Sequence, residues 1–259
     1  MASLPGHDIN YIALTGALHA IGRRGGPPTA PLNLVGDFGG GGMLMAFGML
    51  AGILSARQTG KGRVVDAAMI DGASALMAMF HALRAKGDFS TDRGTHLLDT
   101  GAFFYDVYQT RDSQWVSIGA IETQFWHELC DIMELPDDMR HSQFDESRWE
   151  EFRTVLAGRI ARHDRAELDE MFAGRNTCYA PVLSLAEVSD HPHNAARRTL
   201  IEVDGVVQAA PAPRFDGAPP TVPWPQRKPG EDSRGVLEQA GYSEVEIDRL
   251  IDQGAVSAP

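Results

Sequence analysis

The spacing of apolar residues predicts helices in the first part of the chain. Residues 6–22 are mostly apolar after a polar opening, and a break rich in glycine and proline follows at residues 25–28. Residues 43–57 are apolar on every side, which is typical of a buried helix, and Gly60 ends the stretch.

A short strand and a second helix are predicted next. Val64 and Val65 form a β-like centre between more polar residues. Asp71 is a suitable N-cap for a helix over 72–86, and Gly87 is its stop signal.

From about residue 101 the pattern changes and predicts a hairpin followed by helices. Residues 103–109 and 115–120 favour two strands that flank a turn at 111–113. A later helix has four apolar residues at positions i, i+3, i+7 and i+11, which share one face: Trp149, Phe152, Leu156 and Ile160.

The last part of the chain is punctuated by caps and prolines. Asp164 and Glu167 have the spacing of a capping box, and Gly174 ends the helix that this box begins. Residues 211–229 are rich in proline and predict an extended connector, after which the helical pattern returns from Glu231. We therefore expect two α/β units with a boundary near residue 100.

Charge and cysteine content exclude several classes of protein. Asp and Glu total 35 against 23 Lys and Arg, a net charge of −12, which disfavours nucleic acid or an anionic membrane surface as a partner. The longest apolar run, residues 43–54, is shorter than the roughly 20 residues of a membrane span. The N-terminus lacks the features of a signal peptide, so we expect a cytoplasmic protein without a membrane span. Cys130 and Cys178 predict neither a disulfide scaffold nor a zinc site.

Several short motifs have a structural interpretation that is more common than the functional one. The triplet 37–39 spells the magnesium-binding motif of kinases, but the other kinase motifs are absent. The glycines at 39–42 favour a close backbone approach over a phosphate site. His191 and His193 flank a proline, which is more typical of a surface turn than of a metal site.

Three polar positions in apolar surroundings are candidates for chemistry. His7 and Asp8 stand at the start of an apolar segment, where buried polar groups need hydrogen bonds or a function. Asp37 is flanked by apolar residues and glycines, with Asn33 four residues earlier. Glu122 follows the predicted strand at 115–120. Taken singly, such residues are more often structural than catalytic.

Four motifs together resemble a known family. The segments Gly6–Tyr11, Pro31–Gly40, Gly60–Asp66 and Gly119–Glu122 closely resemble α-methylacyl-CoA racemases, which belong to the family III CoA-transferase (CaiB/BaiF) superfamily. The C-terminal part from residue 212 to residue 241 resembles the same family. The resemblance covers essentially the whole chain, and the motifs occur in the family's order.

The resemblance implies an α/β family III CoA-transferase fold with an incomplete Rossmann-like large domain and a smaller α+β domain. Family members carry about a further third of their length ahead of the Gly-His-Asp motif, so we expect a chain that is N-terminally truncated relative to them. The implied order has five parts: the remaining large domain at 1–70, a connecting helix at 71–100, the small domain at 101–190, an extended linker at 191–228 and a C-terminal segment at 229–259 that returns to the large domain.

The resemblance also implies a reaction, the epimerisation of 2-methylacyl-CoA thioesters. His7 and Asp37 would be two bases on opposite faces of the α-carbon, with Glu122 bonded to His7 and Asn33 bonded to Asp37. The backbone N–H of Asp8 would hold the thioester oxygen. Two tunable bases and a preorganised donor are what proton transfer through an enolate needs, without a cofactor or metal, since CoA is part of the substrate.

Five residues are predicted to bind the acyl-CoA substrate, and alternatives to the racemase remain open. The predicted binding residues are Gly6, Tyr11, Met69, Met77 and Met79, because flexible methionines suit a variable acyl chain. In the transferase alternative Asp37 is the nucleophile, and His7 then has no obvious role. A third possibility is a non-catalytic chain. The predicted partner is a second copy in an interlocked homodimer, a full-length relative or a separate N-terminal segment.

Overall fold

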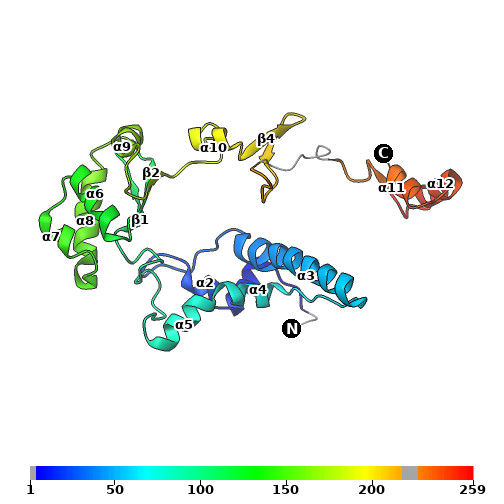
Figure 1. The fold of residues 1–259 in the computed structure, drawn as a ribbon, viewed down its shortest axis with the longest axis horizontal. Coiled ribbons are helices and arrows are strands. Elements are labelled where there is room, and N and C mark those ends of the chain that lie inside the picture. The colour runs from blue at the N-terminus through cyan, green and yellow to red at the C-terminus, as the bar shows by residue number, and fades with distance from the viewer. Residues whose placement is uncertain (1–3, 218–226, 259) are drawn as a thin grey trace. The chain divides into compact units, whose positions relative to one another are not determined.

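The chain forms two compact units, residues 1–182 and residues 183–259. The fold is described from a computed structural model over residues 4–217 and 227–258 (Figure 1). The boundaries predicted for the five parts of the chain stay predictions.

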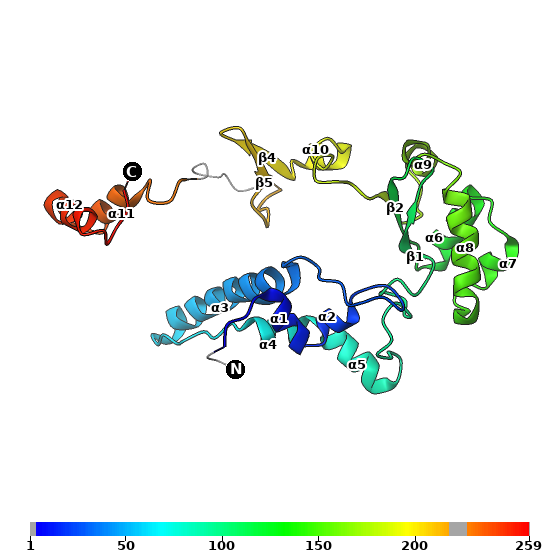
Figure 2. The same ribbon diagram turned by 180° about the vertical axis from the view of Figure 1, so that it is seen from behind.

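The first hundred residues form helices. In chain order these are α1 (Asp8–Leu14), α2 (Ala17–Ala20), the π-helical segment η1 (Leu34–Met43), α3 (Leu44–Thr59), α4 (Met69–Leu76) and α5 (Ala78–Lys86). Helix α1 contacts both η1 and α4, and Figure 2 shows these helices from behind.

Glycines let η1 pack directly on α4. A Cβ atom at Gly40 would lie 2.6 Å from the backbone nitrogen of Ala73, and one at Gly72 would collide with the carbonyl of Gly40. Both contacts are far closer than side chains allow, so the two backbones touch. The close backbone approach predicted for the glycines at 39–42 is thus present.

Helix α3 forms as predicted, but the prediction that it is buried is wrong. Phe47 is 71% exposed and Leu50 is 64% exposed, and α3 has no buried residue. Among the described residues, η1 adjoins α3 and Val65 covers two of its glycines, but these contacts leave its large apolar side chains exposed. Burial requires a covering element as well as an apolar sequence.

Together η1 and α3 form one helical run of 26 residues, 34–59. Its length and apolar composition are sufficient to cross a membrane, a test that core helices of soluble proteins also pass. The run is longer than the apolar stretch 43–54 because the glycine-rich segment joins it. The expected absence of a membrane span stays a prediction.

The strand predicted at Val64-Val65 does not form. A strand needs a hydrogen-bonded partner, and within the described ranges none pairs with residues 61–68. Val65 instead packs on α3, where a Cβ at Gly48 would lie 2.8 Å from its Cγ1.

The predicted helix at 72–86 is present with different bounds. It begins at Met69, because the carbonyl of Ala68 accepts from the backbone N–H groups of Asp71 and Gly72. Asp71 therefore lies in the first turn and is not the N-cap. Met77 separates α4 from α5, and Gly87 ends α5 in the left-handed region as predicted.

Residues 101–182 form a three-stranded antiparallel sheet covered by helices. The strands β1 (Tyr105–Gln109), β2 (Trp115–Gly119) and β3 (Tyr179–Pro181) lie in the order β1-β2-β3, and the predicted hairpin is confirmed. The helices are α6 (Thr123–Ile132), α7 (Asp137–His141), α8 (Trp149–Ile160) and α9 (Arg165–Phe172).

The core of this region is aromatic and contains the predicted face of α8. The ring of Phe103 meets those of Trp126 and Phe152 edge-on, at centroid distances of 5.1 and 5.3 Å. All four residues of the predicted face of α8 are buried. The capping box of α9 is also confirmed, since the Asp164 N–H donates to Glu167 Oε2 at 2.9 Å.

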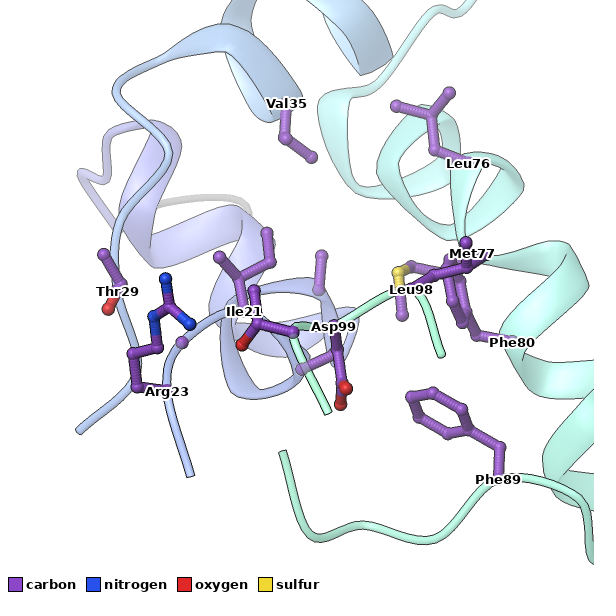
Figure 3. A pocket seen from close by; sticks show the side chains of 14 residues that line it. Ile21, Arg23, Thr29, Val35, Leu76, Met77, Phe80, Phe89, Leu98 and Asp99 are labelled. Carbon is purple, nitrogen blue, oxygen red and sulfur yellow. The ribbon is translucent and has the colours of Figure 1, made fainter. Parts of the chain in front are cut away.

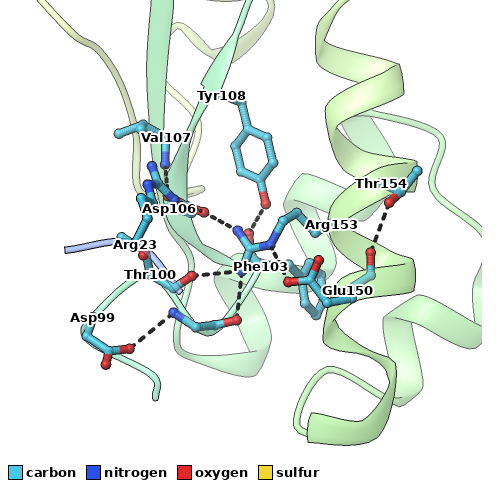
Figure 4. Close-up of polar contacts among 11 residues, drawn as sticks. Arg23, Asp99, Thr100, Phe103, Asp106, Val107, Tyr108, Glu150, Arg153 and Thr154 are labelled. Carbon is cyan, nitrogen blue, oxygen red and sulfur yellow. Dashed lines mark hydrogen bonds and ion pairs between the residues drawn. The ribbon is translucent and has the colours of Figure 1, made fainter. Parts of the chain in front are cut away.

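A buried carboxylate ties the helical region to the sheet. Asp106, on β1, has a side chain only 2% exposed and pairs with two arginines (Figure 4). Arg23 Nη1 lies 2.6 Å from Asp106 Oδ1, and Arg153 of α8 contacts Oδ2. Arg153 Nη2 also donates to the carbonyls of Thr100 and Gly101, at 2.8 and 2.7 Å.

The second unit holds two small groups of elements. Residues 191–209, predicted as part of an extended linker, form α10 (Pro192–Arg197) and a hairpin of β4 (Leu200–Val203) and β5 (Val206–Ala209). The predicted proline-rich connector lies partly outside the described residues. The predicted helical tail is present as α11 (Ser233–Gln239) and α12 (Glu244–Asp252).

Candidate active site

His7 and Asp8 begin helix α1. His7 is the exposed N-cap, and its backbone N–H donates to Asn10 Oδ1 at 3.1 Å. Asp8 is the first helical residue, so its backbone N–H has no acceptor within the helix. That N–H and the positive end of the helix suit a negatively charged oxygen.

The side chain of Asp8 connects this helix start to the segment that carries Asp37. Asp8 Oδ2 accepts from the backbone nitrogen of Gly36 at 2.7 Å and from that of Asp37 at 2.8 Å. A Cβ at position 36 would collide with this oxygen, so only glycine permits the contact. The residue next to His7 therefore fixes the backbone of Asp37.

The oxygen Asp8 Oδ1 is buried and has no hydrogen-bond partner among the described residues. Sequence reasoning assigned only the backbone N–H of Asp8 and missed its side chain. The signal that could have found it is the position of a carboxylate at the start of an apolar segment, where it needs donors.

Asn33 lies against Asp37, as the predicted pairing requires. Asn33 Nδ2 donates to Asp37 Oδ2 at 3.2 Å, and both side chains are exposed. Asn33 precedes η1 and Asp37 lies in its first turn, which places the two on neighbouring turns. The catalytic roles of both residues stay predictions.

Glu122 has no hydrogen bond to the other candidates in the described part of this chain. It is the exposed N-cap of α6, directly after β2, and among the described residues no hydrogen bond joins it to His7. The pKa of the Cys178 thiol is raised by burial and, to a smaller extent, by the negative charge of Glu122. The predicted contact between Glu122 and His7 is therefore absent here.

The residues predicted to bind substrate have four different surroundings. A Cβ at Gly6 would lie 3.1 Å from the Tyr11 ring, so these two adjoin. Met69 packs beside Gly41, and Met79 is half exposed. Met77 lines a cavity of about 520 Å³, shown in Figure 3.

That cavity does not contain the predicted catalytic residues. Of the segment around Asp37, only Val35 reaches its wall. Among residues 4–217 and 227–258, no cluster of three or more His, Cys, Asp or Glu side chains is placed to hold a metal. His191, the N-cap of α10, and His193 within it stay predicted as a surface pair.

The fold and these motifs are those of CoA-transferase family III. The sequence profile of that family matches residues 1–233, and the chain belongs to it. Among its relatives is a Homo sapiens protein named alpha-methylacyl-CoA racemase, 37% identical over 98% of this chain and 69% of the relative. The Mus musculus protein of the same name is 35% identical over 99% and 69%.

Relatives with another activity in their names are also similar. A succinyl-CoA:mesaconate CoA-transferase of Haloarcula hispanica is 31% identical over 77% of this chain and 50% of the relative. Among solved structures, a CaiB/BaiF family protein from Brucella suis matches with a TM-score of 0.73 and 18% identity, over 92% of this chain and 64% of that one. The chain thus spans about two thirds of the length of the two racemases and of the Brucella suis protein.

Proposed function

We propose that this chain catalyses the epimerisation of 2-methylacyl-CoA thioesters. The proposal rests on the hydrogen bond that the Asp8 carboxylate accepts from the backbone N–H of Asp37. Because Asp8 directly follows His7 in the chain, this bond connects the two candidate bases. An imidazole and a carboxyl group are thereby held on two contacting elements, next to a free helix N–H. The identity to proteins named as racemases supports the same reaction.

The proposed reaction moves one proton at a time. One base removes the α-proton, and its electron pair passes to the thioester oxygen, where the Asp8 N–H stabilises the enolate. The other group, protonated, delivers a proton to the opposite face of the α-carbon. In the reverse direction His7 and Asp37 exchange roles. No cofactor takes part, because CoA is part of the substrate and its thioester bond is not broken.

We propose that Glu122 sets the tautomer of His7, as a hydrogen-bonded carboxylate does. Since the two are not bonded in the single chain, this role requires an assembled protein. An interlocked homodimer, a full-length relative or an N-terminal segment would provide that assembly, and the exposed apolar side chains of α3 support an association. We also propose that the protein is cytoplasmic and that its acyl substrates derive from lipids.

The alternative is a CoA transferase in which Asp37 attacks the thioester. The similarity to the Haloarcula transferase favours it, although the identity is lower. His7 discriminates the two, because epimerisation needs a second base. In the third alternative the chain is a non-catalytic partner of a longer relative.

Substitution of each candidate base tests the proposal. With single epimers of 2-methyldodecanoyl-CoA in D₂O, we expect both His7→Ala and Asp37→Ala to abolish inversion. Each variant should still exchange the α-proton slowly, but only in the epimer whose proton faces the remaining base. Glu122→Gln should lower the rate less than either. The control is His193→Ala, an exposed histidine on α10. Undiminished inversion in His7→Ala would contradict the two-base mechanism.

A further inference from the structure

Two apolar cavities adjoin beside α2 and α5. The first is the cavity of about 520 Å³, and the second measures about 540 Å³. Both volumes are in the range of small-molecule sites. Ala20, Met77, Phe80 and Phe89 line both cavities and so form a shared wall. Figure 3 shows Met77 beside the rings of Phe80 and Phe89, whose centroids are 5.3 Å apart.

The charged groups of the first cavity are already engaged. Arg23 is paired with Asp106, as described above. Asp99 accepts from the backbone nitrogens of Gly94 and His96, each at 2.7 Å. The remaining lining is almost entirely aliphatic and aromatic, so the first cavity offers its ligand an apolar surface.

The second cavity is cationic at its polar part. His19, His81, Arg84 and Arg93 line it, and no Asp or Glu does. Arg93 is fixed, since its Nε and Nη1 donate to the carbonyls of His19 and Gly26 at 2.7 and 2.6 Å. In the parts of the chain that the structure describes, the side chain of the exposed Arg84 has no hydrogen bond or ion pair.

Acidic residues outnumber basic ones in this chain, whose net charge is −12, yet the lining of the second cavity contains two arginines and no Asp or Glu. The position of Arg84 in the last turn of α5 suits the helix dipole, which accounts for a cation there. It does not account for the absence of acidic side chains from a cavity that also holds two histidines. A ligand with an anionic group would complete this charge distribution.

We propose that the two cavities bind an aliphatic chain that ends in an anionic group. The chain occupies the apolar cavity, passes Met77 and Phe80, and places its anion at Arg84. The ligand is either a free fatty carboxylate or the distal carboxylate of a dicarboxylic acyl thioester. None of the predicted catalytic residues lines either cavity, whereas Met77, which is predicted to bind the acyl-CoA substrate, lines both. The thioester form of the ligand therefore rests on the proposed function, and the free carboxylate form does not.

Calorimetry on the full chain with decanoate and 1-decanol tests the charge requirement. We expect decanoate to bind at least tenfold more tightly than decanol, which has the same chain without the charge. Arg84→Gln should weaken decanoate about tenfold and leave decanol unchanged. The control Arg57→Gln, an exposed arginine at the end of α3, should change neither. Equal affinity for both ligands, or no effect of Arg84→Gln, would overturn the proposal.

A second variant tests the apolar part of the site. Met77→Gln places an amide in the wall common to both cavities and should weaken decanoate and decanol alike, with the helical circular dichroism retained. Unchanged binding of both ligands in this variant would show that the chain does not lie in these cavities.

Displacement of bound decanoate distinguishes the two sources of the anion. Stronger displacement by 2-methyldodecanedioyl-CoA than by 2-methyldodecanoyl-CoA assigns the site to a distal carboxylate. Displacement by neither assigns it to free fatty carboxylates. Equal displacement by both would mean that the terminal anion is not recognised and would refute the proposal. Since binding is measured without turnover, these results are independent of whether the chain is an epimerase.

Discussion

The carboxylate of Asp8 accepts hydrogen bonds from two backbone N–H groups that begin η1, those of Gly36 and Asp37. In Asp8→Ala the buried N–H of Gly36 loses its acceptor, a change that costs about 1–3 kcal/mol. Asp8→Asn keeps an oxygen acceptor and should cost less. Urea unfolding measures both, with Asp66→Ala, on the exposed loop before α4, as the control. Equal stability of Asp8→Ala and the wild type would contradict the role assigned to this carboxylate.

Tyr108 is a second buried polar group, and it makes stability depend on high pH. Its hydroxyl donates to the carbonyl of Phe103, and burial raises the pKa of Tyr108 above its ordinary value of 10. A phenol whose pKa is raised by folding contributes its full stability below the unfolded pKa, and that contribution falls as pH rises above about 10.

The variant Tyr108→Phe should therefore flatten the loss of stability above pH 10. At neutral pH it should cost about 1 kcal/mol, the value of one hydrogen bond. The measurement is the free energy of unfolding between pH 8 and pH 11, with the half-exposed Tyr242→Phe as the control. If the wild type and Tyr108→Phe decline in parallel above pH 10, the titration of this hydroxyl does not contribute.

Sequence pattern identified the candidate residues but only part of their contacts. Asn33 and Asp37 are four residues apart, so their proximity follows from a helical turn. The contact between Asp8 and Asp37 joins residues 29 positions apart, and only the packing of α1 on η1 creates it. Asp106 was missed for a similar reason, because a buried aspartate on β1 is explained only by Arg23 and Arg153.

At the scale of helices and strands, features set by residues close in sequence were predicted correctly, whereas contacts with distant elements were not. The hairpin of β1 and β2 and the capping box of α9 follow from residues close in sequence, and both are present. Val64 and Val65 had strand propensity but no strand to pair with. Helix α3 had the sequence of a core helix, but none of its residues is buried. In both cases the missing information was the identity of the neighbour.

The packing of η1 on α4 depends on glycine. We expect Gly40→Ala to destabilise the chain by about 1–3 kcal/mol, because its Cβ would lie 2.6 Å from the Ala73 nitrogen. Gly158→Ala, in α8, faces open space and should stabilise by about 0.5–1 kcal/mol. The measurement is the change in thermal stability of each variant relative to the wild type. Changes of the same sign would contradict the direct backbone contact.

At the scale of the whole molecule, the chain contains the family's catalytic motifs in about two thirds of the family's length. Its match to the Homo sapiens racemase covers 69% of that protein. The exposed apolar side chains of α3, and the lack of a hydrogen bond between Glu122 and His7 among the described residues, are both explained if the working protein includes a further chain or copy. The proposed epimerisation can be measured directly on this chain.

The most direct test is deuterium incorporation from D₂O into a single epimer of 2-methyldodecanoyl-CoA, with and without a carboxylate acceptor. Two bases that each exchange protons with solvent should give inversion and deuterium at C2 of both epimers, and the acceptor should make no difference. Transfer of the acyl-bound CoA to the acceptor without deuterium at C2 would contradict the epimerase and support the transferase. The absence of both deuterium at C2 and transfer of CoA to the acceptor would contradict catalysis by this chain.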